Sequence, residues 1–393
     1  MLESWRWYGP LDKINLEEVA QTRATGVVTA LHEIPYGEVW TIAAIEARQK
    51  LIAKADLGLH WNVVESLPIH EDIKRGSGNL DQLFDTYRAS LRNLAACGVK
   101  TICYNFMPLL DWTRTQLTAP VARGGTALRF SAPHMAAFEI CMLKRPNAEA
   151  DYSADVCAAG ERWFALADET AKSTLLNSIM AGLPGAFDRY SVETLREALK
   201  SYQGIDAATL RSNYARFLAE VMPTVEEHGM RMCVHPDDPP RDILGLPRIV
   251  KNAEDITWIL MQVDSPANGL TLCSGSLGAN PENDVPAIAK MFADRIHFAH
   301  LRNVKKEAGG SFEEVAHLEG DTDMVTLIKV LLEEEQRRVA VGQSDYEIPF
   351  RPDHGHELLD DAGKETHPGY PIVGRMVGLA ELRGVIAALS QRT

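Results

Sequence analysis

The sequence predicts a (β/α)8 barrel that spans residues 1–393 as one domain. Short β-branched apolar runs alternate along the chain with polar or glycine-rich loops and with segments of helical periodicity. Near-continuous apolar runs are typical of strands that are buried on both faces of a parallel sheet. Neither GxGxxG nor GxxxxGK followed by Ser or Thr comes after a predicted strand, so the usual nucleotide-binding forms of an open, doubly wound sheet are not indicated.

Eight strands are expected, and along the chain they cover residues 26–31, 60–65, 99–105, 230–235, 270–273, 296–301, 315–318 and 348–352. Helical periodicity lies between them, at residues 42–55, 80–96, 207–228, 253–263, 285–292 and 324–338. Asp284 stands directly before the helical run VPAIAK, and Asp321–Asp323 before MVTLIKVLL, where an N-cap carboxylate accepts backbone N–H groups. Residues 107–206 have helical patterning without a clear strand. We expect them to form a mostly helical insertion after the third predicted strand, with a separate small domain as the alternative.

The composition excludes several classes of protein. Hydrophobic residues make up 46% of the chain and charged residues 24%, which is typical of a globular protein. The net charge of −14 opposes binding to nucleic acid or to anionic membranes. The longest stretch without Asp, Glu, Lys or Arg, residues 265–281, is rich in Gly, Ser, Asn and Pro, and it does not resemble a membrane span. The N-terminus lacks a secretory signal, and the six cysteines form no CxxC motif. We therefore expect a cytoplasmic protein with reduced thiols.

Polar residues cluster at the carboxyl ends of the predicted strands. They are His32, Glu65, Asn105, His235, Cys273, His300, His317, Asp353 and His354. In a parallel barrel these ends meet at one mouth, so residues that are far apart in sequence would line one pocket. A single histidine at a strand end is more often structural than functional. Five histidines at this repeated position are hard to explain in that way, because each would need its own buried partner.

Four of these residues form a plausible metal site. His235, Cys273, His300 and Asp353 offer two imidazoles, a thiolate and a carboxylate, separated by 38, 27 and 53 residues. These separations exceed those of a zinc finger and suit ligands that converge from different strands. The mixed donors favour Fe²⁺, Mn²⁺, Co²⁺ or Zn²⁺, and four protein ligands leave room for substrate only on a five- or six-coordinate ion, which favours Mn²⁺ or Fe²⁺. Alternatively, Cys273 is a small buried hydrophobic residue and Asp353 caps a loop.

Other polar residues have more than one interpretation. His354 could act as an acid or a base beside the ion. Arg302 is either a cation for an anionic substrate or part of a surface salt bridge. Asp237 and Asp238 in HPDDPP are either partners of the metal-ligand residues or part of a solvated turn, and the turn is favoured; Tyr370 is expected to be a packing residue near the C-terminus. Glu65, Asn105 and His32 are expected to face the mouth and bind substrate hydroxyl or carboxylate groups.

Long strings of the sequence resemble the mannonate dehydratase family. They are WRWYGP (5–10), TGVVTALHEIPYGEVW (25–40), VVESLPIHEDIK (63–74), TICYNFMPLLDWTRT (101–115), VHPDDPPRDILGLPRIV (234–250) and MVGLAELRG (376–384). The resemblance covers essentially the whole length. It implies a xylose-isomerase-like TIM barrel and a lyase that converts D-mannonate, a sugar acid, to 2-dehydro-3-deoxy-D-gluconate and water during glucuronate catabolism.

The resemblance also implies roles for individual residues. The family's ligands for Mn²⁺ or Fe²⁺ fall on His235, Cys273, His300 and Asp353, with one ion per subunit. Its acid/base pair falls on His354 and Tyr370, which makes Tyr370 a catalytic candidate. We also expect a homodimer or a higher homo-oligomer. The alternatives are a sugar isomerase or epimerase on the same barrel, a metal-dependent phosphoesterase of the endonuclease type, and a sugar-acid binding protein without catalysis.

Overall fold

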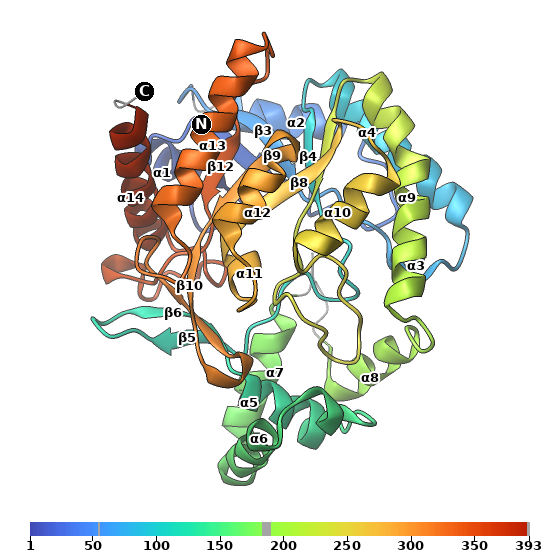
Figure 1. Cartoon of the computed structure of the whole chain (residues 1–393), viewed down its shortest axis with the longest axis vertical. Coiled ribbons are helices and arrows are strands. Elements are labelled where there is room, and N and C mark those ends of the chain that lie inside the picture. The colour runs from blue at the N-terminus through green and yellow to red at the C-terminus, as the bar shows by residue number, and fades with distance from the viewer. Residues whose placement is uncertain (54–55, 183–189, 391–393) are drawn as a thin grey trace.

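The computed structural model of the chain describes residues 1–53, 56–182 and 190–390. Eight parallel strands close into a barrel in the order β1-β12-β9-β8-β7-β4-β3-β2 (Figure 1). Their bounds are β1 Leu2–Arg6, β2 Gly26–Thr29, β3 His60–Glu65, β4 Thr101–Tyr104, β7 Arg231–Val234, β8 Asn268–Cys273, β9 Ile296–Leu301 and β12 Pro349–Pro352. The barrel closes where β1 pairs with both β12 and β2. The predicted fold is therefore confirmed.

Helices surround the barrel. The longer ones are α2 Ile42–Ala53, α4 Leu80–Ala96, α9 Ala207–Glu227, α10 Ala253–Gln262, α13 Met324–Ala340 and α14 Ile372–Ser390, and the shorter ones include α1 Leu16–Gln21, α3 Glu71–Arg75, α11 Ser274–Gly278 and α12 Val285–Met291. Asp284 and Asp323 cap α12 and α13 as predicted. The predicted helix 42–55 agrees with α2, except that residues 54 and 55 lie outside the described residues. None of the described helices is long and apolar enough to cross a membrane.

Two hydrophobic layers hold the barrel together. The larger layer packs the outer faces of the strands against the helices. A smaller cluster contains Val28, Val63, Cys103, Cys233 and Phe298, all fully or almost fully buried and each from a different barrel strand. Because side chains alternate between the two faces of a strand, this cluster fills the interior of the barrel. The packed interior places a solid floor beneath the carboxyl ends of the strands.

The predicted strand at 315–318 is wrong. Residues 312–315 form β11 (Phe312–Val315), which lies outside the barrel, and the apolar pattern continues into a turn at 317–319. His317, placed by the prediction at the end of a barrel strand, is therefore buried in this turn. The missing barrel strand is β1, which the sequence analysis did not find because LESWR is short, carries two charges and has no β-branched residue.

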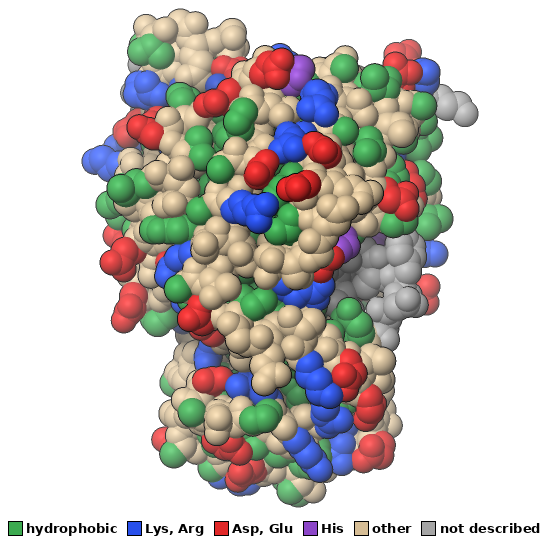
Figure 2. Space-filling view, turned by 90° about the vertical axis from the view of Figure 1, so that its right-hand side faces the viewer, with side chains coloured by type: hydrophobic (Ala, Val, Ile, Leu, Met, Phe, Trp, Pro, Cys, Tyr) green, Lys and Arg blue, Asp and Glu red, His purple; other side chains and the backbone are tan. Residues whose placement is uncertain are grey.

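Residues 107–206 form a hairpin of β5 (Gln116–Pro120) and β6 (Thr126–Phe130), followed by helices that include α5 Ala132–Ala136, α6 Ala154–Leu166, α7 Glu169–Met180 and α8 Val192–Lys200. This range follows the third predicted strand, which is the fourth strand of the barrel because β1 precedes it. Residues 183–189 lie outside the described residues. Figure 1 shows α5 to α8 at one end of the molecule, and Figure 2 shows the same end as the narrower lower part.

A second sheet joins this insertion to the barrel. Its order is β10-β11-β6-β5, with β10 (Asn303–Lys306) and β11 coming directly after barrel strand β9. Antiparallel pairing brings Phe312 opposite Phe130. The two rings stack with their centroids 5.5 Å apart, within a cluster that also contains Val304 and several residues of the insertion. This sheet therefore fixes β11 beside the mouth of the barrel.

Candidate active site

A cavity of about 710 Å³ opens at the carboxyl ends of the barrel strands. This volume is typical of a site for a small molecule. Seven residues that the sequence analysis singled out line it, namely His32, Glu65, Asn105, His235, Asp238, Asp353 and Tyr370. Cys273 and His300 are almost completely buried beside it. The parallel strands thus bring together residues that are far apart in sequence.

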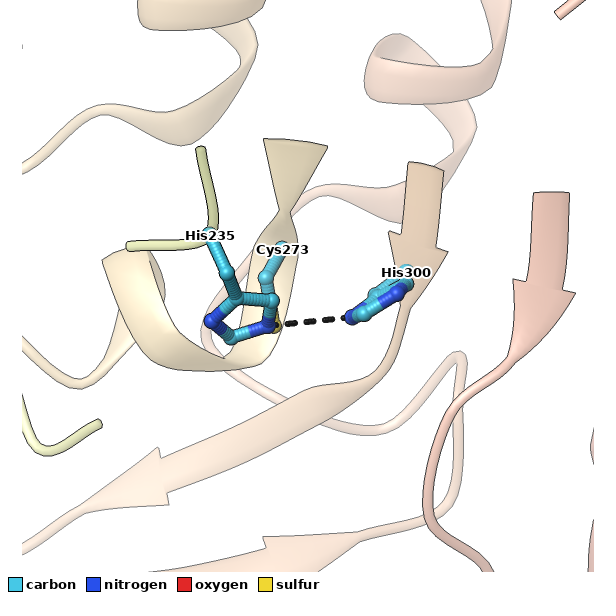
Figure 3. Close-up of side chains that lie close together, drawn as sticks. All are labelled: His235, Cys273 and His300. Atoms are coloured by element: carbon cyan, nitrogen blue, oxygen red, sulfur yellow. Dashed lines mark hydrogen bonds between the residues drawn. The ribbon is translucent and has the colours of Figure 1, made fainter. Parts of the chain in front are cut away.

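His235, Cys273 and His300 form one group of possible metal ligands (Figure 3). Each residue offers one ligand atom, and these atoms all lie within 4.8 Å of one another. His235 follows β7 directly, Cys273 is the last residue of β8, and His300 lies near the end of β9. The three possible ligands therefore lie at or near the carboxyl ends of three barrel strands.

The two imidazole rings are oriented by contacts on their far sides. His235 Nδ1 lies 2.6 Å from the carbonyl oxygen of Pro236, and His300 Nε2 lies 3.3 Å from Glu65 Oε2. The Pro236 carbonyl oxygen can only accept, so His235 carries its proton on Nδ1 and keeps a lone pair on Nε2, whereas His300 Nε2 faces Glu65 without a hydrogen bond. His235 Nε2 and His300 Nδ1 lie 3.0 Å apart and are joined by the dashed line in Figure 3. With His235 protonated on Nδ1, this contact is a hydrogen bond in which His235 Nε2 accepts, and the lone pair of that nitrogen lies close to the His300 ring and the Cys273 sulfur, which fits a site for a metal ion.

Cys273 caps the N-terminus of α11, and its sulfur accepts hydrogen bonds from the Ser276 backbone N–H and hydroxyl group at 3.4 and 3.0 Å. Asp353 Oδ2 lies 3.7 Å from this sulfur. Asp353 thus contacts the three-residue group through Cys273. Burial alone would raise the pKa of Asp353, but the charges of Arg351, His354 and Arg302 hold it well below its usual value. The carboxylate is therefore ionised, as a metal ligand requires.

Tyr370 and His354 lie on the other side of Asp353. The Tyr370 hydroxyl is 3.5 Å from Asp353 Oδ1 and 3.4 Å from Arg351 Nη2, and its ring meets that of His354 edge to face with centroids 5.0 Å apart. Burial raises the pKa of Tyr370 well above its usual value, although Arg351 lowers it in part. Both side chains are nearly buried, and Tyr370 lines the cavity. His354 is not among the described residues that line the cavity, and it lies behind Tyr370 in contact with its ring.

Arg302 and Asp238 are buried, in contrast to the solvated positions considered for them. Arg302 is 1% exposed, so the surface salt bridge is wrong, and it pairs with Asp238, Glu314 and Asp353 at 2.8, 2.8 and 3.3 Å. Arg302 is not among the described residues that line the cavity. Asp237 and Asp238 are 1% and 2% exposed, so the solvated turn is also wrong. The alternative for Asp238, a partner of other site residues, agrees with its ion pair to Arg302, although that arginine lies on another element.

The remaining predicted substrate-binding residues have internal partners. Glu65 receives two hydrogen bonds from Arg351 at 2.7 and 3.0 Å, and His32 Nε2 lies 3.0 Å from Arg6 Nη2. Burial lowers the pKa of His32 well below its usual value, so its ring is neutral. Asn105 lines the cavity between β4 and the insertion.

Sequence reasoning missed several residues of the cavity wall, including Arg6, Tyr8, Arg351 and His367. Arg6 and Tyr8 were missed because β1 was not found. The sequence contains a signal for Arg351 as a site residue, because Arg351 stands two residues before Asp353 in a predicted strand. His367 stacks on Tyr8 with ring centroids 3.7 Å apart, and no local pattern predicts that contact.

Comparison with known proteins identifies the family. The family model described as D-mannonate dehydratase (UxuA) matches residues 1–393. The chain belongs to the D-mannonate dehydratase family. It is therefore a hydro-lyase, and the reaction of its family is the dehydration of D-mannonate.

Two individual proteins agree with this family. A mannonate dehydratase from Chromohalobacter salexigens is 53% identical over 392 residues, which cover 100% of this chain and 99% of that protein. The crystal structure of a mannonate dehydratase from Streptococcus suis serotype 2 has a TM-score of 0.77 and 33% identity, covering 100% of this chain and 95% of that one. A xylose isomerase domain protein from Planctomyces limnophilus, with a TM-score of 0.51 and 11% identity, covers 100% of this chain and 98% of its own, and shows only the shared barrel fold.

Proposed function

We propose that this chain converts D-mannonate to 2-dehydro-3-deoxy-D-gluconate and water in the cavity at the barrel mouth, as a step of glucuronate catabolism. The observation that carries the proposal is the convergence of His235, Cys273 and His300, with Asp353 adjoining Cys273, beside Tyr370 and His354. A dehydratase of this kind needs an electrophile for the substrate carboxylate and two groups that exchange protons. The cavity offers residues for both purposes.

We propose that His235, Cys273, His300 and Asp353 hold one Mn²⁺ or Fe²⁺ ion per subunit. Nitrogen, sulfur and oxygen donors in one set suit first-row divalent ions, and the approach of the His235, Cys273 and His300 ligand atoms to within 4.8 Å of one another supports a cation here. When bound, such an ion is a Lewis acid that stabilises negative charge developing on the substrate carboxylate, a contribution of several kcal/mol.

The residues of the chain then move the protons. The C2–H bond of the substrate breaks and its proton passes to one member of the Tyr370–His354 pair. The C3–O bond breaks, and the departing hydroxide takes a proton from the other member to leave as water. The resulting enol tautomerises to the 2-keto acid, so the products are the keto acid and one water. The edge-to-face contact of the two rings, with centroids 5.0 Å apart, supports a shared role for this pair.

Glu65, Asn105 and His32 are proposed to orient the hydroxyl groups of the substrate. All three line the cavity, and the contacts of Glu65 with Arg351 and of His32 with Arg6 hold their side chains in place. Arg302 contributes from behind the wall by holding Asp238 and Asp353. The cytoplasmic location and the oligomeric state stay predictions.

The decisive experiment pairs metal analysis with a keto-acid assay. Protein purified without oxygen, because both a thiolate and Fe²⁺ are sensitive to oxidation, is analysed for bound metal and incubated with D-mannonate. The proposal expects one divalent ion per chain and formation of a 2-keto-3-deoxy acid. An isomerase or epimerase would instead keep all hydroxyl groups, and activity in fully metal-free protein would contradict the metal site.

A further inference from the structure

A carboxylate outside the barrel contacts the proposed acid/base histidine. Glu314 lies on β11, in the antiparallel sheet that joins the insertion to the barrel, and it is 3% exposed. Both of its carboxylate oxygens lie 2.9 Å from His354 Nδ1. The register of β11 with β10 and β6 therefore places this charge directly behind the imidazole ring.

The two oxygens of Glu314 have different partners. Oε1 accepts hydrogen bonds from Arg114 Nε and Nη2 at 3.0 and 2.7 Å and from Arg302 Nη1 at 2.8 Å. For Oε2, the described contact is His354 Nδ1. The arginines thus fix the rotation of the carboxylate, and Oε2 is left facing the imidazole.

Arg302 Nη1 also lies 2.8 Å from His354 Nδ1. The groups around the ring therefore decide which of its two nitrogens carries the proton. Burial would raise the pKa of Glu314, but the charges of His354, Arg302 and Arg114 lower it to about 2. The carboxylate is therefore an acceptor only, and its Oε2 needs an N–H. Arg302 Nη1 has two N–H groups, one of which donates to Glu314 Oε1, and its Nη2 donates to Asp238. Glu314 Oε2, in contrast, has only His354 Nδ1 as a donor among the described contacts. The arrangement is satisfied when Nδ1 carries the proton.

We propose that Glu314 is a positioning residue that holds His354 with its proton on Nδ1 and leaves Nε2 as the nitrogen that exchanges a proton with the substrate. This inference rests on the proposed catalytic role of His354. A carboxylate that fixes the tautomer of a catalytic histidine is a general device of proton-transfer sites. Here the carboxylate comes from an added sheet and not from the barrel itself.

The substitution Glu314→Gln tests this role with little change in shape. Because three arginine N–H groups converge on the Oε1 position, the amide oxygen of the glutamine must take that place. Its NH₂ group then faces His354 Nδ1, which must become an acceptor, so the ring proton moves to Nε2. We expect kcat to fall at least about 10²-fold, with KM little changed, because binding groups are untouched while proton transfer is blocked.

Nitrogen NMR of ¹⁵N-histidine-labelled protein, loaded with diamagnetic Zn²⁺, reads the tautomer directly. His354 is assigned by the signals that the His354→Asn variant loses. The proposal expects protonated Nδ1 in the wild type and protonated Nε2 in Glu314→Gln. Glu313→Gln is the matched control, because Glu313 is the half-buried neighbour on the same strand. It should leave both the kinetics and the His354 signals unchanged.

Each outcome decides between the alternatives. A wild-type His354 with its proton on Nε2 overturns the proposal even if the Gln variant fails to fold, and so does a Glu314→Gln variant with wild-type kcat. Glu314→Asp retains the charge, so it should keep the Nδ1 proton and recover part of the activity, whereas a purely structural role would give no such recovery. If wild-type protein forms no keto acid from D-mannonate, the proposed function fails separately from this tautomer measurement.

Discussion

Removal of the Asp238 charge should destabilise the folded chain strongly. Asp238 is 2% exposed, accepts hydrogen bonds from Arg114 Nη1 and Nη2 at 2.7 and 3.0 Å, and accepts a third from Arg302 Nη2 at 2.8 Å. Asp238→Asn keeps the size of the side chain but leaves two buried guanidinium groups short of one negative charge. Breaking a buried ion pair from one side costs roughly 3–5 kcal/mol. We expect the free energy of unfolding at pH 7 to fall by about this amount.

The effect should depend on pH with a definite sign. Burial would raise the pKa of Asp238, but Arg114 and Arg302 outweigh it and hold the pKa below its usual value. A carboxylate with a depressed pKa in the folded state stabilises fully above its unfolded pKa of about 3.9, and this stabilisation is lost as the pH falls further. The difference between wild type and Asp238→Asn should be constant from neutral pH down to about pH 5 and should shrink below about pH 4.

Urea unfolding of both proteins at several pH values measures this difference. Asp264→Asn is the control, because Asp264 also pairs with an arginine, Arg295 at 2.8 Å, but its side chain is 90% exposed. That variant should change stability by less than about 1 kcal/mol. Equal stability of Asp238→Asn and wild type, or a difference that grows as the pH falls, would refute the reasoning.

Three further substitutions test the site and the core. Tyr370→Phe should lower turnover by about 10²–10⁴-fold in the keto-acid assay while bound metal stays constant, and full activity would remove Tyr370 from the mechanism. Cys273→Ser should weaken metal retention during dialysis by at least about 10-fold, whereas Cys97→Ser should not, and equal retention would argue against a sulfur ligand. Phe298→Ala should lower the free energy of unfolding in urea by about 3–5 kcal/mol, because Phe298 fills the barrel interior. Met291→Ala, at a position that is 63% exposed, should lower it much less, and similar losses in the two variants would contradict this packing.

The parts of the site on barrel strands were predictable from the sequence. His235, Cys273 and His300 each follow or end an apolar run, and in a parallel barrel all such ends meet on one side. No long-range pairing has to be known for this conclusion. The residues alone, without their partners, therefore locate the metal-ligand group, and the structure brings its atoms within 4.8 Å.

The parts of the site that depend on long-range pairing were not predictable. Glu314 stands in the sequence FEEV, and nothing local distinguishes it from its neighbour Glu313. Its position beside His354 comes from the pairing of β11 with β6, which lies about 180 positions earlier in the chain. Arg114, likewise, is a loop residue whose carboxylate partners lie on two other segments. Antiparallel register of this kind has no signature in either strand alone.

Ion pairs around the cavity connect the site residues on the barrel strands with those that long-range pairing brings to the site. Arg351 is paired with Glu65 and Asp353, Arg302 with Asp238 and Glu314, and Arg114 with the same two carboxylates as Arg302. These three arginines therefore stabilise buried carboxylates and have little charge to spare for an incoming anion. Arg6 also lines the cavity, and its Nε lies 3.9 Å from the Glu65 carboxylate, so it is less closely paired than these three arginines. In a chain with a net charge of −14, Arg6 and the divalent ion proposed for the His–Cys–His group are therefore the candidates for attracting a sugar acid. The ion pairs set the positions of Asp353 and His354, and the proposed ion would supply positive charge for the substrate carboxylate.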